Sequence, residues 1–312
     1  MAHFSIVTPC YNEQDNVREL HSRIQAEFAK LPQHTYEHIF IDNSSTDATV
    51  ALVKDIIREH NNVRLIVNSR NFGHIRSPYH GTLQGSGDAT ILMASDLQDP
   101  PNLIPQFIAK WEAGFKIVKA VKTNSEETPL MFLARKLFYG FINRLADIDL
   151  TKNYTGTGLY DKRIIEILKD IDDPYPYFRG LISDIGFEFA IVEFYQPTRK
   201  RGITKNNFYT LYDIAMLGIT NHTKIPLRMA ALGGFVLGAI SFALAVLFLL
   251  LKLIFWDRFQ AGMAPILLGM FFFASVQLFF LGILGEYIGN IYTQVQKRPL
   301  VVEKERVNFP PQ

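Results

Sequence analysis

Residues 1–205 alternate short apolar runs with longer stretches in which apolar side chains recur at helical spacing. The short runs are rich in β-branched and aromatic residues, so they predict strands, and the longer stretches predict amphipathic helices. Strands that alternate with helices are typical of an α/β domain with a mainly parallel, doubly wound sheet. The predicted strands cover residues 4–8, 36–42, 63–68, 89–95 and 115–121.

Two longer apolar runs follow this domain, at residues 229–251 and 263–285. As a helix, each run would be roughly 34 Å long, which is enough to cross a hydrocarbon core of about 30 Å. The runs predict a transmembrane hairpin within residues 229–296, and a helical hairpin buried in a soluble core is the alternative. Residues 206–228 are expected to form an interfacial helix and linker, and the polar residues 297–312 a disordered tail.

Positive charges flank the predicted hairpin. Lys224 and Arg228 precede the first run, and Lys297 and Arg298 follow the second. The positive-inside rule then places both flanks in the cytosol. Residues 1–3 lead straight into a strand, without the basic and apolar regions of a secretory signal. We therefore expect a multi-pass protein of the inner or plasma membrane, with its first domain and both termini in the cytosol.

The charge is local rather than global. The net charge of +2 does not predict a nucleic-acid partner, and the single cysteine, Cys10, excludes an intrachain disulfide. Basic side chains gather at Arg199, Arg201 and Lys205, which could clamp a phosphate or touch anionic lipid. Arg135 lies in an apolar stretch that predicts either an interfacial helix near a lipid head group or a buried amphipathic helix.

Polar side chains also gather where three predicted strands end, in Pro9–Glu13, Asp42–Asp47 and Ser95–Gln98. Ligands of parallel α/β sheets bind at the carboxyl ends of the strands, so the three segments are expected to line one crevice. Asp96 and Gln98 offer oxygen ligands that suit Mg²⁺ or Mn²⁺, and such an ion would suit a diphosphate. The alternatives are a solvated acidic turn before a proline pair and, for the second segment, turn formers and a helix cap.

Together these segments resemble those of a known family. The chain is similar over nearly its whole length to family 2 glycosyltransferases of the GT-A fold, in the membrane-anchored branch that transfers sugars to polyprenyl phosphate. The resemblance implies a Rossmann-like nucleotide-sugar domain with a mainly parallel sheet, interfacial helices and a C-terminal two-helix transmembrane hairpin. It rests on Val7–Glu13, Ile41–Asp47, Ser69–Gly73, Asp96–Pro101, Arg199–Lys205 and Gly285–Gly289.

The resemblance also implies an activity and a set of site residues. The activity is inverting transfer of a hexose or N-acetylhexosamine from a nucleotide-sugar, with UDP as the expected nucleotide, to polyprenyl (undecaprenyl) phosphate. A divalent metal, Mg²⁺ or Mn²⁺, would be held by Asp96 and Gln98. The residues expected to bind the nucleotide-sugar are Pro9, Tyr11, Glu13, Asp42, Ser44 and Asp96. Those expected to contact the acceptor or the diphosphate are Arg135, Arg199, Arg201 and Lys205.

Two departures from the family pattern concern the metal and the base. The usual Asp-x-Asp motif reads Ala94-Ser95-Asp96, so Asp96 must carry more of the metal binding. Thr155–Gly158 stand where relatives often have an acid, and we interpret Gly156–Gly158 as a turn. Asp161 is expected to cap a helix, which leaves Asp184 as the candidate catalytic acid. A lipid monophosphate, with a second pKa of about 6, is already largely dianionic and can attack without first losing a proton.

Two other functions stay open. A membrane glycan synthase would use a saccharide acceptor, although two crossings are few for a channel and a Gln-x-x-Arg-Trp signature is absent. A catalytically idle membrane scaffold would explain the missing first acid of the metal motif. Small residues at the helix surfaces would permit close packing within or between subunits, so a homo-oligomer is expected. These residues are Gly233, Gly234, Gly238, Gly282, Gly285 and Gly289.

Overall fold

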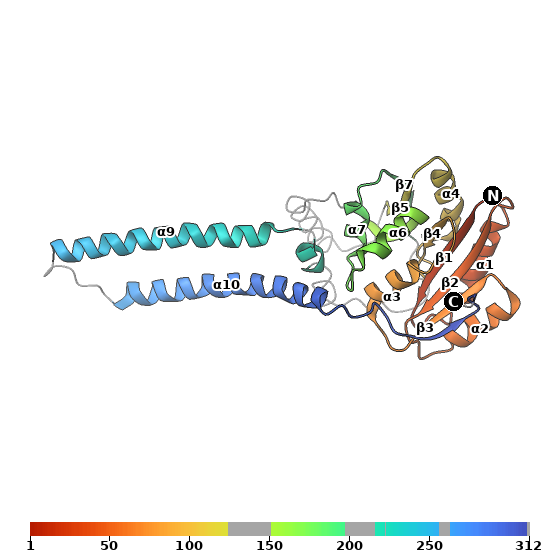
Figure 1. Ribbon diagram of the computed structural model, residues 1–312, viewed down its shortest axis with the longest axis horizontal. Helices are drawn as coiled ribbons and strands as arrows, with labels where there is room; N and C mark the ends of the chain where they lie inside the picture. Colours follow the sequence, from red (N-terminus) through yellow and green to blue (C-terminus); the bar gives the residue numbers. More distant parts are fainter. Residues whose placement is uncertain (124–150, 197–215, 222, 256–262, 311–312) are drawn as a thin grey trace.

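The computed structural model describes residues 1–123, 151–196, 216–221, 223–255 and 263–310. Its strands are β1 (His3–Cys10), β2 (Thr35–Asp42), β3 (Val63–Asn68), β4 (Ala89–Leu92), β5 (Ile117–Lys122), β6 (Tyr154–Asp161), β7 (Phe189–Phe194) and β8 (Glu303–Val307). In this part of the chain they form one eight-stranded sheet in the order β7-β5-β6-β4-β1-β2-β3-β8 (Figure 1).

The centre of the sheet is parallel. β1 pairs in parallel with β2 and β4, β2 pairs in parallel with β3, and β5 pairs in parallel with β7. β6 runs antiparallel between β4 and β5, and β8 runs antiparallel along β3. The prediction of a mainly parallel α/β sheet is therefore confirmed, and its five predicted strands correspond to β1 to β5.

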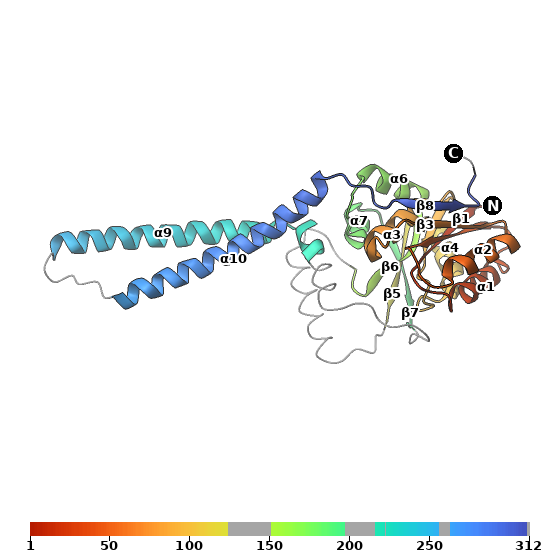
Figure 2. The same cartoon turned by 90° about the horizontal axis from the view of Figure 1, so that it is seen from below.

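Helices cover both faces of this sheet (Figure 2). The buried side chains of α1, α2 and α4 pack on one face, against residues such as Phe4, Ile6 and Phe40. α3, α6 and α7 pack on the other face, around Tyr160. The helices of the domain are α1 (Val17–Phe28), α2 (Thr49–Glu59), α3 (Gly73–Thr82), α4 (Ile104–Glu112), α6 (Lys162–Ile171) and α7 (Phe178–Asp184), with a short 3-10 helix at Pro101–Leu103.

β6 occupies the stretch that we interpreted as a turn, so that interpretation is wrong. A Cβ on Gly158 would lie 2.2 Å from the carbonyl oxygen of Val118, which shows that the glycine serves the close approach of β5 to β6. Gly156 has a φ of +104°, a backbone conformation that side chains rarely permit. Asp161 ends β6 and accepts a hydrogen bond of 3.0 Å from the backbone N–H of Arg163, which confirms the predicted helix cap.

We expect Gly158→Ala to destabilise the domain by about 1–3 kcal/mol, because the new methyl group would force β5 and β6 apart. The measurement is thermal unfolding of the detergent-solubilised chain. Gly238→Ala in the first long C-terminal helix is the matched control, since no described atom lies within 4 Å of its Cβ position. Equal unfolding temperatures for the two variants would contradict the close-approach argument.

The C-terminal residues, predicted to be disordered, contain β8, so that prediction is wrong. β8 lies along β3 at the edge of the sheet (Figure 1). Ion pairs fasten it there: Lys54 Nζ lies 2.8 Å from Glu305 Oε1, and His80 Nε2 lies 2.6 Å from Glu303 Oε1. Because the strand is made almost entirely of charged residues, it lacks the apolar alternation by which a strand is predicted.

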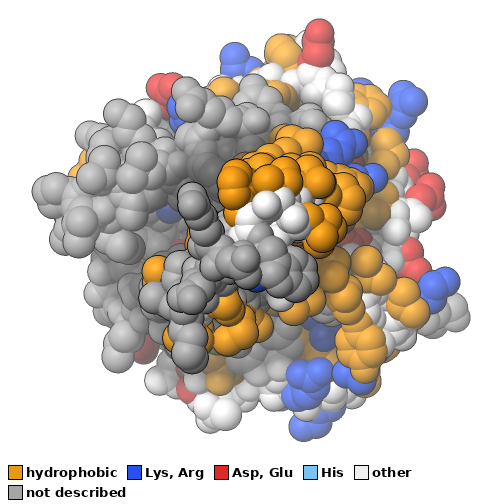
Figure 3. All heavy atoms as spheres, turned by 90° about the vertical axis from the view of Figure 1, so that its left-hand side faces the viewer, with side chains coloured by type: hydrophobic (Ala, Val, Ile, Leu, Met, Phe, Trp, Pro, Cys, Tyr) orange, Lys and Arg blue, Asp and Glu red, His pale blue; other side chains and the backbone are white. Residues whose placement is uncertain are grey.

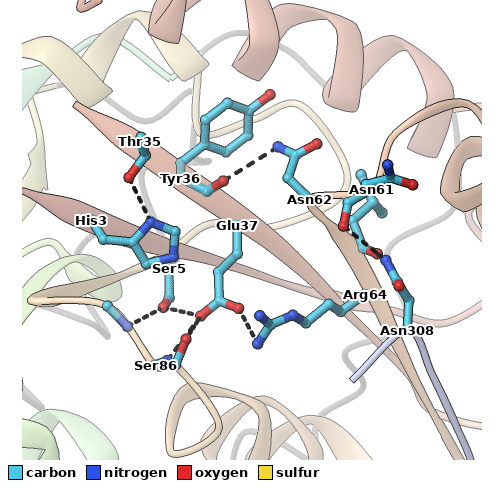
Figure 4. A network of polar contacts seen from close by, with 12 residues as sticks. His3, Ser5, Thr35, Tyr36, Glu37, Asn61, Asn62, Arg64, Ser86 and Asn308 are labelled. Carbon is cyan, nitrogen blue, oxygen red and sulfur yellow. Dashed lines mark hydrogen bonds and ion pairs between the residues drawn. The ribbon is translucent and has the colours of Figure 1, made fainter. Parts of the chain in front are cut away.

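A buried carboxylate, Glu37 of β2, connects the central strands with the C-terminal segment (Figure 4). It accepts hydrogen bonds from the hydroxyl of Ser5 and from the backbone N–H and hydroxyl of Ser86, and it pairs with Arg64. The Arg64 guanidinium lies 5.4 Å from the ring centre of Phe309. Removing one partner of such a buried ion pair lowers the free energy of unfolding. The network therefore stabilises the packing of β1, β2 and β3 against one another and against the C-terminal segment.

Two long helices, α9 (Ile225–Ile254) and α10 (Met263–Val295), extend from the domain (Figure 1). Both are long and apolar enough to cross a membrane, with mean hydropathies of 2.7 and 2.3. No part of either apolar window is buried, so the alternative of a hairpin inside a soluble core is wrong for the described residues. Of the six glycines, only Gly233 has a described neighbour: the Phe280 ring lies 3.2 Å from its Cβ position. The homo-oligomer stays a prediction.

Two buried histidines lie between the sheet and the helices of one face. His21 Nδ1 of α1 lies 3.0 Å from His38 Nδ1 of β2, and His38 Nε2 lies 3.0 Å from the hydroxyl of Thr8. Burial, together with the nearby His60 and Arg18, lowers the pKa of His21 to about 4, and burial lowers the pKa of His38 well below its usual range. Both rings are therefore neutral in the folded protein at neutral pH.

This pair predicts a loss of stability in mild acid. Between pH 6.5 and about 4, His21 and His38 bind protons in the unfolded state but stay neutral in the folded state. The free energy of unfolding therefore falls as the pH falls. We expect a decrease of about 3 kcal/mol from His21 alone across this window and a further decrease from His38, measured by thermal unfolding. His21→Gln/His38→Gln should flatten the decrease and His3→Gln should leave it unchanged; an equally steep profile in the double variant would contradict the assignment.

Candidate functional site

The ends of β1, β2 and β4 lie next to one another because of the strand register. Cys10 is the register partner of Asp42, and the Asn43 N–H donates to the Cys10 carbonyl at 2.9 Å. On the other side of β1, the Met93 N–H donates to the Val7 carbonyl at 3.0 Å. The loops that follow these three strands therefore leave the sheet from one edge, as the sequence predicts.

Each of the three loops contains one non-glycine residue with a left-handed backbone. These residues are Asn12 (φ 57°), Ser44 (φ 67°) and Leu97 (φ 59°). Such conformations are uncommon outside glycine and concentrate at ligand clamps and active sites. Their presence in all three loops marks this edge as the candidate site.

Hydrogen bonds connect the first loop to the second. The Asn12 N–H donates to Ser45 Oγ at 2.9 Å, and Asn12 Oδ1 accepts from the Thr46 N–H at 2.8 Å. The Glu13 N–H donates to the hydroxyl of Thr49 at 2.9 Å. These bonds form one framework that carries the predicted nucleotide-sugar residues of the first two loops. Pro9, Tyr11, Glu13 and Ser44 are half-buried in it.

Asp42 is buried below this framework. Its carboxylate accepts hydrogen bonds from the backbone N–H of Ser45, at 2.9 Å, and from the Ser45 hydroxyl. Burial raises the pKa of Asp42, and the Ser45 hydrogen bonds oppose the shift. Neighbouring Cys10 is buried too, and burial followed by the charge of Asp42 raises its thiol pKa well above the usual range. Cys10 therefore packs as a small buried residue next to Asp42.

The third loop is built around two carboxylates. Asp96 is half-buried, and its Oδ1 accepts a hydrogen bond of 3.1 Å from the Gln98 N–H. Asp99 is buried and accepts from the hydroxyl of Thr157, on β6, at 2.5 Å and from the backbone N–H of Ala94. Burial raises the pKa of Asp99, and the nearby charge of Asp96 adds to the effect. Asp99 thus connects its own end of the loop to Ala94 at the start of the loop and to Thr157 of β6. The Asp-Pro-Pro sequence alone did not predict this role.

The donor atoms of this loop fit a metal ion that arrives together with a diphosphate. The described residues contain no group of three His, Cys, Asp or Glu side chains that could hold a metal by themselves. Mg²⁺ is commonly held by one or two carboxylates while substrate phosphates and water complete its coordination. Asp96 offers one such carboxylate, and the half-buried Gln98 next to it offers an amide oxygen.

A network of side-chain amides supports the second loop, and the sequence did not point to it. Asn43 Oδ1 accepts from the Phe72 N–H at 2.8 Å and from Asn68 Nδ2 at 3.2 Å. Asn43 Nδ2 donates to Asn71 Oδ1 at 2.8 Å and to the Gly73 carbonyl at 3.1 Å. All four hydrogen-bonding positions of this buried amide are therefore used, and they hold the loop after β3 against the end of β2.

The structure does not bring all of the predicted residues together. Asp184 is exposed at the last position of α7, and no hydrogen bond or ion pair among the described residues joins it to Asp42, Asp96 or Asp99. Its role as a catalytic acid stays a prediction. The predicted phosphate-binding residues Arg135, Arg199, Arg201 and Lys205 lie outside the described residues.

A mainly parallel sheet whose strand ends carry such loops defines an α/β domain of the nucleotide-binding type. Residues 5–168 match glycosyl transferase family 2, and the chain belongs to this family. It is therefore a glycosyltransferase with a GT-A-like fold, as the sequence motifs predicted.

Curated relatives match nearly the full length of the chain. An uncharacterized glycosyltransferase, YkcC of Bacillus subtilis (strain 168), is 33% identical over 304 residues, which are 96% of this chain and 92% of that protein. The bactoprenol glucosyl transferase of Shigella phage SfII is 30% identical over 302 residues, 96% of this chain and 97% of that protein.

Solved structures are more distantly similar. The mannosyltransferase PcManGT from Pyrobaculum calidifontis, in complex with GDP-Man and Mn²⁺, is 14% identical with a TM-score of 0.45 and covers 95% of this chain and 87% of its own. S. aureus TarS 1–349 in complex with UDP-GlcNAc is 18% identical with a TM-score of 0.39 and covers 70% of this chain and 67% of its own.

Asn43→Ala should destabilise the domain by about 2–3 kcal/mol, because it leaves the buried Phe72 N–H and the Asn68 amide without their shared acceptor. Thermal unfolding measures the loss. Asn62→Ala is the control: Asn62 donates a hydrogen bond of 3.3 Å to the Tyr36 carbonyl and its side chain also hydrogen-bonds the Tyr36 side chain, so we expect a smaller cost of about 1 kcal/mol. A similar loss of unfolding free energy in both variants would contradict the argument that the four hydrogen bonds of Asn43 stabilise the domain more than those of Asn62.

Proposed function

We propose that this glycosyltransferase transfers one hexose or N-acetylhexosamine from a nucleotide-sugar, with UDP as the nucleotide, to polyprenyl phosphate with inversion at the anomeric carbon. The observation that carries the proposal is the meeting of three polar loops at one strand edge of a chain that continues into two exposed apolar helices. Full-length similarity to a bactoprenol glucosyl transferase supports the lipid acceptor.

In this proposal the first two loops bind the nucleoside. The half-buried Pro9, Tyr11 and Ser44 form the rim of the pocket, and the buried Asp42 lies at its floor. The hydrogen bonds between these loops fix the pocket before the donor arrives, so less ordering entropy is lost when the donor binds.

The third loop faces the diphosphate. Asp96 and Gln98 would hold Mg²⁺ or Mn²⁺, which, when bound, neutralises charge that develops on the leaving diphosphate. Asp99 keeps the loop in place through Thr157 and Ala94, so that Asp96 is presented in a fixed position. A phosphate oxygen of the acceptor forms the new bond to the anomeric carbon as the bond to the nucleoside diphosphate breaks, and the dianionic acceptor has no proton to lose.

The course of the chain supports the proposed membrane arrangement. β1 starts at the end of the domain that is remote from the two long helices and runs toward them (Figure 1). The strand ends that carry the candidate site therefore face the side from which the helices extend. With α9 and α10 across the inner or plasma membrane and both termini in the cytosol, the site faces the cytosolic leaflet, where a polyprenyl phosphate head group would lie.

Asp96→Ala should lower the rate of sugar transfer by at least about 100-fold, because the loop loses the carboxylate nearest the leaving group. The assay uses detergent-solubilised full-length protein, undecaprenyl phosphate and a panel of UDP- and GDP-sugars, with and without EDTA. Mass spectrometry of the lipid product counts the sugars added.

The matched control is Asp55→Ala, which removes a half-buried carboxylate of α2 that forms an ion pair with Arg58 among the described residues. Full activity of Asp96→Ala, or full activity of the wild type in EDTA, would reject the metal role. A product that carries a sugar chain would favour the glycan synthase, and no transfer with any donor would favour the idle scaffold.

A further inference from the structure

Three arginines from three separate segments meet where α10 joins the domain. Arg70 lies in the loop after β3, Arg76 in the first half of α3, and Arg298 in the segment between α10 and β8. The Arg70 and Arg76 guanidinium carbons lie 4.0 and 5.4 Å from the ring centre of Phe72. Arg76 also donates a hydrogen bond to the Pro299 carbonyl, which brings the Arg298 segment against α3.

This cluster has no acidic partner within the described part of the chain, where none of the three arginines forms an ion pair with Asp or Glu. Asp173, the acid of the same junction, is already engaged: its Oδ1 accepts from Gln294 Nε2 at 2.8 Å and from the Tyr175 N–H at 2.9 Å. Burial lowers the pKa of Arg76, and the positive charges of Arg70 and Arg298 act in the same direction while Tyr175 opposes them. An anion at this position would relieve the repulsion.

One polar atom of the cluster is also left without a partner. Arg76 Nε is buried and makes no hydrogen bond with any described residue. Buried donors in proteins are nearly always paired. A phosphate oxygen, which accepts strongly from guanidinium groups, has the chemistry that would satisfy this donor.

In the proposed membrane arrangement, the cluster lies at the membrane-facing end of the domain. Arg298 is the third residue after Val295, the last residue of α10, and Lys297 has a left-handed φ of 46° that turns the chain back toward β3. Seen along the hairpin axis, Lys and Arg side chains surround the apolar side chains in projection (Figure 3). A cationic group at this height meets the phosphate layer of a leaflet.

The cluster is also set apart from the loop that presents Asp96. Arg70 follows β3 and Asp96 follows β4, and β1 and β2 lie between these two strands. With neighbouring strands about 4.8 Å apart, the two strand ends are separated by roughly 14 Å. The arginine cluster and the carboxylate of Asp96 therefore follow different strands, and the lipid test below separates an anion held by the cluster from the acceptor phosphate.

We propose that Arg70, Arg76 and Arg298 form a binding site for the phosphate of an anionic phospholipid of the surrounding leaflet. The site holds the domain on the membrane surface next to the hairpin, through contacts that are separate from the donor pocket. Arg70 and Arg298 are exposed and reach the head group, and Arg76 contributes its unpaired Nε from below.

The test measures lipid binding by the full-length protein in neutral detergent, by thermal shift and native mass spectrometry. Phosphatidylglycerol is the probe, and phosphatidylcholine, inorganic phosphate and undecaprenyl phosphate are the comparison ligands. We expect phosphatidylglycerol to bind and stabilise the protein and phosphatidylcholine to do neither. Arg76→Gln and Arg298→Gln should each weaken the apparent affinity for phosphatidylglycerol by about fivefold, which corresponds to one basic residue at a membrane surface.

Arg58→Gln on α2 is the matched control and should bind phosphatidylglycerol like the wild type. Arg298→Gln guards against misfolding, because no hydrogen bond or ion pair of its side chain is found among the described residues and its removal relieves repulsion with Arg76, so the unfolding temperature without lipid should not fall. Wild-type affinity in both cluster variants would overturn the proposal, as would equal binding of phosphatidylcholine. A loss confined to undecaprenyl phosphate would also overturn it and assign the arginines to the acceptor. Since no sugar transfer is measured, these outcomes are independent of the proposed function.

Discussion

The parallel register of β4, β1 and β2 is the constraint on which the rest of the structure depends. It sets Cys10 level with Asp42 and carries the Met93 N–H to the carbonyl of Val7, so three loops emerge from one edge at nearly the same height. Each loop then turns sharply through one left-handed residue, and side-chain hydrogen bonds connect the first loop to the second. A shift of one residue in any of these pairings would turn the site residues to the opposite face of the sheet.

Much of this arrangement could be predicted from the chain itself. Apolar runs with β-branched residues mark β1 to β5, and the uncharged residues 229–251 mark α9. The polar segments Pro9–Glu13 and Asp42–Asp47 point to the crevice because they follow buried strands. Asp161 was recognisable as a helix cap because it directly precedes an amphipathic helix. In each of these cases local pattern and tertiary environment agree.

The features that escaped prediction depend on contacts distant in sequence. β6 contains Gly156 and Gly158, which are typical of turns. The close approach of β5 explains Gly158, and the positive φ explains Gly156. β8 is held by ion pairs to α2 and α3, so its charged sequence gives no strand pattern. Nothing in the sequence next to Asn43 or Asp99 indicates their roles, because their hydrogen-bond partners Asn71 and Thr157 lie in other segments of the chain. No short window of the sequence contains these partners.

The connection between α10 and β8 is short, since only residues 296–302 separate Val295 from Glu303. Fully extended, they span about 25 Å. In the proposed membrane arrangement the domain is therefore tethered to the hairpin at two places, at the sheet edge formed by β8 and at the segment before α9. The domain then cannot leave the membrane surface or diffuse independently of the hairpin. The lipid acceptor then reaches the candidate site by lateral diffusion in the membrane, whereas the soluble nucleotide-sugar reaches it by diffusion through the cytosol.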